Sequence, residues 1–306
     1  MHFFGKTSID FMAKRKLLYF VSSAVILVGF SSFIFKGVDY GIDFRGGTEL
    51  FVEFSAPVSI GDVRSAMANA GYPRAEIKTV GNENNILIRT VEQNESSHVL
   101  DQIKTGLASA FPNLTFEILR FDKIGPKIGA ELRRDALYAI IFSLLAILVY
   151  IGFRFKFVYG VGAVVALFHD VLITIGFVSM FDGISPFLNL EIDQNMVAAL
   201  LTLVGLSVND TVVVFDRIRE NLKIYRSASF IEVANKSIND TLSRTIITSG
   251  TIFIVLFVLL IFGGDVTRGF AFALLVGITT GTYSSIYIAS AIVLDWTQRK
   301  KVEKPA

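Results

Sequence analysis

The chain has 306 residues, of which 52% are hydrophobic and only 18% are charged, and its mean hydropathy is +0.57. Ordinary soluble domains carry about 25% charged residues, so this composition argues against a simple soluble enzyme. The formal net charge of +2 predicts no nucleic-acid partner, and the lack of cysteine excludes disulfides, thiolate metal sites, cysteine-ligated clusters and thiol catalysis.

The apolar residues are gathered into six blocks, each about as long as a helix needs to cross a hydrocarbon core of about 30 Å. Asp170 and Asp210 are the only acidic residues within these blocks. We therefore predict a polytopic α-helical membrane protein with transmembrane helices at 17–35, 136–153, 157–181, 195–215, 246–262 and 270–294.

The first block, 17–35, could instead be a cleaved signal peptide. It is long for the hydrophobic region of a signal peptide, and the Ser-Phe-Ile-Phe-Lys-Gly segment at its end lacks a small-x-small cleavage site. We expect a retained transmembrane helix.

The orientation follows from the distribution of Lys and Arg. If the N-terminus is cytoplasmic, the segments on that side hold sixteen Lys and Arg, whereas the short loops on the other side, 182–194 and 263–269, hold only Arg268. Positive residues favour the cytoplasmic side, so both termini are predicted to lie there. The cytoplasmic segments are then 1–16, 154–156, 216–245 and 295–306.

The polar segment 36–135, between the first two predicted helices, is long enough to fold by itself outside the membrane. Ser59 is predicted to cap its first helix, with Asp62 as a box-like partner. The order of elements is β-α-β-β-α-β, that of a ferredoxin-like α+β domain. The strands are expected at 48–54, 75–80, 85–91 and 114–121, and the helices at 59–70 and 95–111.

This outside segment offers no evident catalytic group and no cluster of metal ligands. The chain also has no phosphate-binding loop of the G-x-x-x-x-G-K-[ST] type. We expect a binding or moving module that is not an enzyme and that needs no cofactor or metal. Any work the protein does would then draw on an ion gradient.

An ionisable residue at membrane depth is costly and suggests a functional site. Asp210 lies deep in the fourth predicted helix, with Ser207 one turn before it and Asn209 and Thr211 on either side. A hydrogen bond that holds helices together would be the structural alternative, but a serine or asparagine could supply it more cheaply. We favour ion or proton transfer at Asp210.

Two further groups admit both interpretations. His169 and Asp170 lie mid-span in the third helix, where they form either a second part of a proton pathway or a buried polar contact. Arg244 and Thr248 share a face at the cytoplasmic start of the fifth helix. Composition alone favours Arg244 as a positive anchor, although its long side chain could reach inward to a carboxylate.

The sixth predicted helix carries small residues four positions apart. They are Gly277, Gly281, Ser285 and Ala289. Such a ladder lets two helices approach closely, either within the chain or between subunits.

Taken together and in order, five motifs resemble those of the SecF subunits in the SecD/SecF family of bacterial protein-export membrane proteins, part of the resistance-nodulation-division (RND) superfamily. The motifs lie at 41–47, 124–129, 166–171, 208–221 and 244–250. The first two supply the structural motif residues Gly41, Asp43, Gly46, Gly47, Gly125 and Pro126.

The resemblance implies half of an RND-type transporter, with SecD as the other half. It also implies association with the SecYEG translocon, with YajC as a further candidate partner, in the bacterial inner membrane. The proton-motive force would then assist the translocation of a preprotein. The family's proton-pathway aspartate corresponds to Asp210 and its essential arginine to Arg244, so function becomes the favoured role of Arg244. Ser207, Asn209 and Thr248 are the neighbouring candidates.

Two rival functions remain open. A passive assembly factor of the translocon would need no ion coupling. A small-molecule exporter of the same general fold is disfavoured. Single-chain exporters of this type have about twice as many membrane spans as this chain, and two large outside domains where this chain has one small domain. The chain begins close to its first apolar block, as the separate rather than the fused form of such a subunit would.

Overall fold

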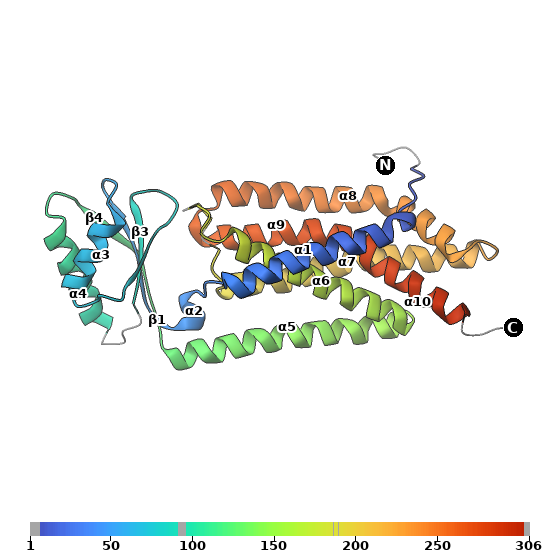
Figure 1. Ribbon diagram of the computed structural model, residues 1–306, viewed down its shortest axis with the longest axis horizontal. Coiled ribbons are helices and arrows are strands. Elements are labelled where there is room, and N and C mark those ends of the chain that lie inside the picture. Colours follow the sequence, from blue (N-terminus) through green and yellow to red (C-terminus); the bar gives the residue numbers. More distant parts are fainter. Residues whose placement is uncertain (1–6, 91–95, 186, 189, 303–306) are drawn as a thin grey trace.

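The computed structural model describes residues 7–90, 96–185, 187–188 and 190–302. They form a helical bundle with a small sheet domain at one end (Figure 1). Six helices in this part of the chain are long and apolar enough to cross a membrane, as predicted. They are α1 (Arg15–Phe35), α5 (Pro126–Arg154), α6 (Phe157–Phe181), α7 (Gln194–Ile224), α8 (Phe230–Phe262) and a last span formed by α9 (Asp265–Ser284), the π-helical turn η2 (Ser285–Ala289) and α10 (Ser290–Val302). The short turn η1 (Met12–Lys14) precedes α1.

Several helices extend beyond the apolar blocks that predicted them. Helix α5 begins at Pro126, where proline needs no amide partner in the first turn. Helix α8 begins after Ser229, which forms a capping box with Glu232: the Ser229 hydroxyl accepts from the Glu232 amide at 3.3 Å, and the Glu232 carboxylate accepts from the Ser229 amide at 2.9 Å. Polar residues continue a helix in water, so hydropathy marks the apolar part of each helix and not its ends.

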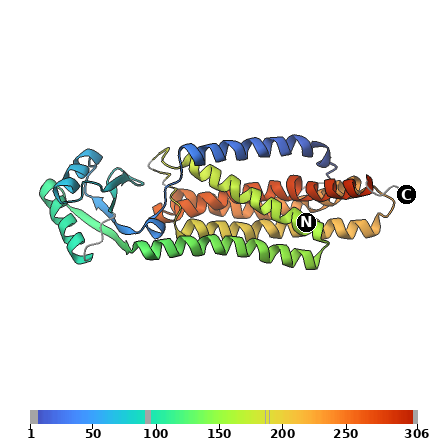
Figure 2. The same ribbon diagram turned by 60° about the horizontal axis from the view of Figure 1, so that its bottom comes forward.

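Helix α6 is the most enclosed span and packs against α1, α5, α7 and α9. Figure 2 shows α1 and α5 on opposite sides of the bundle. The crossing of α1 with α6 is tight, because a Cβ on Gly29 would lie 2.8 Å from the Cα of Gly176. Large exposed apolar side chains cover the outer faces of α1, α5 and α8, as expected for surfaces that meet lipid or another subunit.

The sheet domain has four antiparallel strands in the order β2-β3-β1-β4, with helices α3 and α4 on one face. This is the predicted ferredoxin-like arrangement. Ser59 caps α3 by accepting a hydrogen bond from the Gly61 amide at 3.2 Å, without the reciprocal bond expected of Asp62. The elements are β1 (Gly47–Phe54), α3 (Ile60–Asn69), β2 (Glu76–Thr79), β3 (Asn85–Thr90), α4 (Ser96–Ala110) and β4 (Phe116–Ile124). The predicted ends of the third strand, at 91, and of the second helix, at 95, lie outside the described residues.

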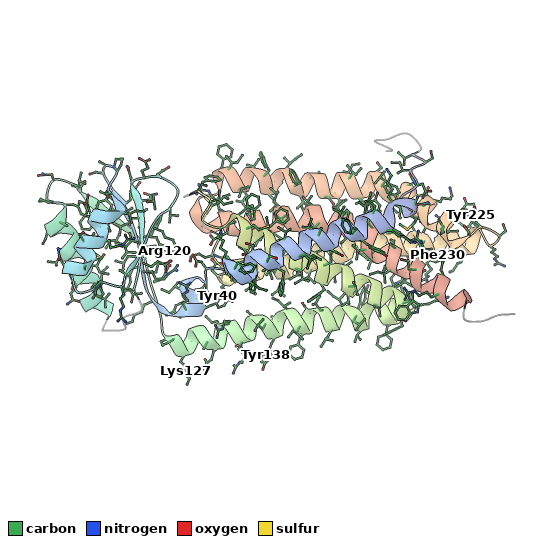
Figure 3. The ribbon with its side chains drawn as sticks, viewed as in Figure 1. Tyr40, Arg120, Lys127, Tyr138, Tyr225 and Phe230 are labelled. Atoms are coloured by element: carbon green, nitrogen blue, oxygen red, sulfur yellow. The ribbon has the colours of Figure 1, made fainter. Side chains whose placement is uncertain are left out.

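The start of α1 and the end of α10 lie at the end of the bundle opposite the sheet domain (Figures 1 and 2). In Figure 3, Tyr225 and Phe230 mark that far end, while Tyr40 and Arg120 lie where the bundle meets the sheet domain. The fold therefore places the sheet domain on one side of the apolar spans, and the start of α1 and the end of α10 on the other.

Candidate functional site

Asp210 lies inside the bundle at the meeting point of three helices. Its side chain belongs to α7, and the residue is 6% exposed. The Ser249 hydroxyl of α8 donates a hydrogen bond to the Asp210 carboxylate at 3.1 Å, and the Thr282 hydroxyl of α9 donates to the Ser249 oxygen at 2.8 Å. A protonation change at Asp210 can thus reach α8 and α9 through two hydroxyl groups.

Arg244 lies on α8, more than one turn before Ser249, and is exposed. Its charge acts on the Asp210 carboxylate, but in the described part of the chain no carboxylate comes within 4.0 Å of the guanidinium. The structure therefore brings Arg244 near Asp210 without a direct ion pair. Thr248 shares a helical face with Arg244, yet Ser249 is the residue that contacts the carboxylate.

Asp170 is the centre of a second polar cluster and is fully buried on α6. Its carboxylate accepts hydrogen bonds from the Nδ1 of His169 at 3.0 Å, from Ser207 of α7 at 2.7 Å and from Ser284 of α9 at 2.8 Å. Both His169 and Asp170 are buried, which leaves the proton pathway and the buried polar contact open as interpretations. The two neighbours do contact each other, although successive helical residues point about 100° apart.

The spacing of Ser207 and Asp210 suggested one polar group around Asp210, and this expectation was wrong in part. Ser207 is buried and binds Asp170, because the face of α7 that carries it packs against α6 and α9. Thr211 is also buried and donates to the Ser207 backbone carbonyl at 3.2 Å. Asn209 is exposed on the outer face of α7 and does not join either cluster.

The small-residue ladder of the last span packs within the chain. A Cβ on Gly277 would lie 2.6 Å from the Leu203 side chain, and one on Gly281 would lie 3.0 Å from the Ser207 hydroxyl. The absence of these side chains lets α9 approach α7 and brings Ser207 toward Asp170. Ser285, the third member of the ladder, is buried and begins the π-helical turn.

The two glycine motifs meet at a joint between the bundle and the sheet domain. The first motif forms the short helix α2 (Ile42–Arg45), and Gly46 follows it with φ = +72°. A Cβ on Gly46 would lie 2.9 Å from the Cα of Pro126, which opens α5. The positive φ and this close approach both require glycine at position 46.

The joint also contacts the start of α7. Asp43 accepts a hydrogen bond from the Gln194 amide at 2.9 Å, and Asp193 caps α7 by accepting from the Met196 amide at 2.7 Å. Burial raises the pKa of Asp193, and the nearby negative charge of Asp43 raises it further. The Gly41 amide donates to the Ile192 carbonyl at 3.0 Å, which continues the contact.

An ion cluster crosses the same joint. Arg89 of β3 pairs with Glu49 of β1 at 2.6 Å and with Glu191, from the loop before α7, at 2.5 Å; Arg89 and Glu49 are buried, and Glu191 is partly buried. Lys78 of β2 pairs with Asp39 at 2.7 Å and with Glu191 at 3.2 Å. The Glu191 carboxylate therefore ties the loop of the bundle to two strands of the sheet domain.

The charges of this cluster shift the pKa values of its members. Partial burial by itself would raise the pKa of Asp39, but the hydrogen bond and charge of Lys78, with the charges of Arg45 and Arg89, lower it. Burial by itself would lower the pKa of Lys78, yet the hydrogen bond that Lys78 donates to Asp39 and the charge of Glu191 raise it. The shifts stabilise the charged forms that hold the joint.

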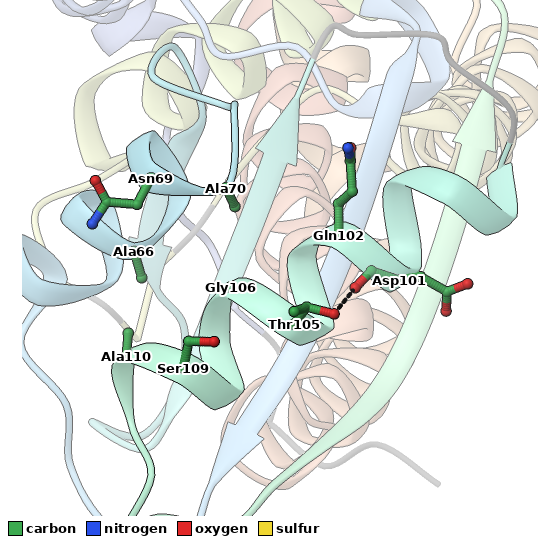
Figure 4. A pocket seen from close by; sticks show the side chains of 9 residues that line it. All are labelled: Ala66, Asn69, Ala70, Asp101, Gln102, Thr105, Gly106, Ser109 and Ala110. Atoms are coloured by element: carbon green, nitrogen blue, oxygen red, sulfur yellow. Dashed lines mark hydrogen bonds between the residues drawn. The ribbon is translucent and has the colours of Figure 1, made fainter.

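The sheet domain also carries a cavity of about 570 Å³ between α3 and α4, on the face away from the bundle (Figure 4). Its lining residues are small or neutral apart from Asp101.

The structure gives no group of three His, Asp or Glu side chains, among the residues it describes, that could hold a metal ion. The chemistry that the bundle offers is thus a pair of buried carboxylates within hydrogen-bonded hydroxyl groups.

Sequence reasoning missed three residues that complete these clusters. Ser249 is part of the 244–250 motif, but the helical spacing from Arg244 points to Thr248, and no sequence pattern marks Thr282 or Ser284. Hydroxyl side chains are common in apolar helices, so their presence carries little signal. These hydroxyls can be recognised only from their hydrogen-bond partners, which the packing of α8 and α9 against α6 and α7 brings close.

Comparison with known proteins matches both the sequence and the arrangement. Residues 102–299 match the family model for the C-terminal region of the protein export membrane proteins SecD and SecF, and residues 31–58 match the SecD/SecF GG motif. The chain is 46% identical over 299 residues to the protein translocase subunit SecF of Rhodothermus marinus, covering 98% of this chain and 96% of that protein. It is 37% identical over 289 residues to the SecF subunit of Pseudomonas aeruginosa, covering 94% and 91%.

Solved structures agree. The crystal structure of SecDF, a translocon-associated membrane protein from Thermus thermophilus, superposes with a TM-score of 0.84 and 37% identity, and SecDF in its super-membrane-facing form with 0.72 and 36%. The match covers 96% and 98% of this chain but only 39% and 40% of the SecDF chains, so this chain spans about two fifths of SecDF. The chain belongs to the SecD/SecF family of protein export membrane proteins.

Proposed function

We propose that this chain works as a SecF-type subunit that, together with SecD, couples proton movement across the membrane to preprotein translocation through SecYEG. The observation that carries the proposal is the buried Asp210 carboxylate within the spans, held by Ser249 and subject to the charge of Arg244. A carboxylate at the centre of a membrane helix costs about 2.5 to 3.5 kcal/mol on insertion scales. A hydroxyl could join the helices at lower cost, so titration is the property that a carboxylate adds.

The chemistry of the site follows from its hydrogen bonds. An ionised Asp210 accepts the Ser249 hydrogen bond and is attracted to Arg244. A proton on the carboxylate removes both the charge and one acceptor position, which weakens the tie between α7 and α8. A proton that crosses 100 mV releases about 2.3 kcal/mol, enough to change the balance between two helix packings.

The proposed setting is the bacterial inner membrane, with both termini cytoplasmic and the sheet domain on the outer side. The start of α1 and the end of α10 lie opposite the sheet domain, and this, together with the excess of Lys and Arg in the segments predicted to be cytoplasmic, supports the orientation (Figure 1). The exposed apolar faces of α1, α5 and α8 are available to SecD and membrane lipid, with YajC as a further candidate partner. The sheet domain would meet the emerging preprotein as a non-catalytic module.

The proposal is tested by Asp210→Asn, which preserves size and hydrogen bonding but removes titration. Export of a preprotein into inverted membrane vesicles is measured with and without a proton gradient. In the presence of a gradient, we expect the variant to export only as fast as the wild type does in the absence of one. Asp216→Asn, the same substitution at an exposed carboxylate on the same helix, is the control and is expected to keep gradient dependence. Normal gradient dependence in Asp210→Asn would instead make the chain a passive assembly factor.

A further inference from the structure

The cluster around Asp170 has an atom that its hydrogen bonds leave unused. His169 is 5% exposed, and its Nδ1 contacts the Asp170 carboxylate at 3.0 Å. The Nε2 atom of the same ring is buried and has no hydrogen-bond partner among the described residues. Leaving such an atom unpaired costs about 1 to 3 kcal/mol. The cost is not explained by packing alone, because an apolar side chain would avoid it.

The geometry fixes which nitrogen can take a proton. In a neutral imidazole one nitrogen donates and the other accepts, and the carboxylate requires Nδ1 to be the donor. Nε2 therefore carries the free lone pair. A proton that binds there makes an imidazolium beside the Asp170 carboxylate, and the two charges compensate each other in the buried site. Ser207 and Ser284 complete the hydrogen bonding of the carboxylate in both states.

The surroundings of the pair are apolar or hydroxylic. Helix α9 presents Tyr283, whose ring lies 6.1 Å from the His169 ring at an interplanar angle of 27°, and η2 presents Tyr287 beside Tyr283. Helix α1 presents Ser22, which is 2.8 Å from the Tyr283 hydroxyl, and α5 packs against α6 through apolar side chains. Helix α7 carries the other carboxylate, Asp210, one turn beyond Ser207.

Two hydroxyls of the last span, only two residues apart, are linked to the two carboxylates, one directly and the other through Ser249. Ser284 donates to Asp170, and Thr282 donates to Ser249, which donates to Asp210. Positions two apart on a helix point about 200° apart, so the end of α9 lies between the two clusters. The π-helical turn η2 begins at Ser285, directly after these residues, and such turns often occur at functional sites.

From this arrangement we infer that His169 and Asp170 form a second proton-binding site, in which Nε2 takes the proton and Asp170 holds the ring. The end of α9 links this site to Asp210. The proton binds the Nε2 lone pair without breaking another bond and leaves by the same atom. The inference that Nε2 binds a proton does not depend on the proposed function. The use of that proton in export does rest on the proposed function.

The test uses the full chain with SecD in lipid nanodiscs and ¹⁵N-labelled histidine, observed by NMR. The chain has three histidines, and His169→Gln identifies the signal of interest. We expect Nε2 to be unprotonated in alkaline solution and to gain a proton as the solution is made acidic. At one fixed pH at which the wild type is partly protonated, Asp170→Asn is expected to lower the protonated fraction by about tenfold, because the compensating charge is lost. An Nε2 that stays unprotonated throughout, or that ignores Asp170→Asn, would overturn the inference.

The link to Asp210 is tested in the same experiment. Asp210→Asn is expected to change the protonated fraction of His169 at fixed pH by at least about threefold, as coupled sites do. Thr282→Val should remove that dependence, whereas Thr279→Val, whose hydroxyl bonds only to the Leu275 carbonyl of its own helix, should preserve it. A His169 signal indifferent to Asp210→Asn would overturn the link. Gradient dependence of export in Asp210→Asn decides the proposed function separately, because the NMR signal does not depend on export.

Discussion

The Ser249 hydroxyl donates a hydrogen bond of 3.1 Å to the Asp210 carboxylate and so joins α8 to α7 inside the bundle. Thr282 extends the contact to α9. The carboxylate therefore lies where three spans can respond to a single proton. Arg244 lies on the same helix as Ser249, so a shift of α8 would move both groups relative to Asp210.

Removal of the Ser249 hydroxyl should impair coupling without removing titration. A hydrogen bond to a charged group contributes about 1.5 to 3 kcal/mol, so Ser249→Ala is expected to reduce gradient-dependent export by about tenfold. Ser249→Thr retains the hydroxyl and should restore it. Thr251→Val is the matched control, because the Thr251 hydroxyl bonds to a carbonyl of its own helix. Equal export by Ser249→Ala and the wild type would show that this hydrogen bond has no part in coupling.

The ion cluster at the joint should hold the sheet domain to the bundle. Arg89→Gln removes the partner that the buried Glu49 and the partly buried Glu191 share, and breaking a buried pair such as Arg89 with Glu49 costs about 3 to 5 kcal/mol. Hydrogen exchange over residues 41–47 should accelerate accordingly. Arg134→Gln, which removes an exposed pair with Asp135, should leave exchange unchanged. A joint equally protected in both variants would rule out this role.

The same joint should weaken in acid. The pKa of Asp39 is lower in the folded chain than its unfolded value of about 3.9, so its contribution is present above that value and is lost as the pH falls through the folded one. Asp193 acts with the opposite sign, since burial raises its pKa and protonation favours the folded form. Comparison of Asp39→Asn with the wild type isolates the contribution of Asp39 from that of Asp193. The difference between variant and wild type in hydrogen exchange over 41–47 should be constant near neutral pH and vanish in strong acid. A difference that grows in acid would contradict the assignment.

The crossing of α1 and α6 should not tolerate a side chain at Gly176. A Cβ there would lie 2.9 Å from the Cα of Gly29, and backbone cannot move aside as a flexible side chain can. Gly176→Ala is expected to cost about 1 to 3 kcal/mol in unfolding by denaturing detergent. Gly205→Ala in α7, where a Cβ meets open space, is the control. Equal stability of the two variants would show that the helices separate readily.

Much of the architecture could be predicted from the sequence, because apolar blocks and alternating strands are local patterns. The six spans and the order of the sheet domain follow from them, and their positions agree with the structure. The ends of α5, α7 and α8 could not be predicted in this way, since polar residues continue these helices beyond the apolar blocks.

The partners of the polar groups were harder to predict. Ser207 lies one turn from Asp210 in sequence, but its hydroxyl binds Asp170 on another helix. Nothing in the local pattern distinguishes these outcomes, because they depend on how the helices pack, as where Gly281 of α9 lies directly against Ser207 of α7. Asp210 could be singled out as a candidate without knowledge of its partners, since a carboxylate in an apolar helix is already exceptional.

The most direct measurement is proton flux through proteoliposomes that contain this chain with SecD. An imposed membrane potential drives protons, and an internal pH-sensitive dye reports their entry. Proton transfer at Asp210 predicts flux in the wild type and in Asp216→Asn, and flux at the level of empty liposomes in Asp210→Asn. Undiminished flux in Asp210→Asn would contradict the role of this carboxylate.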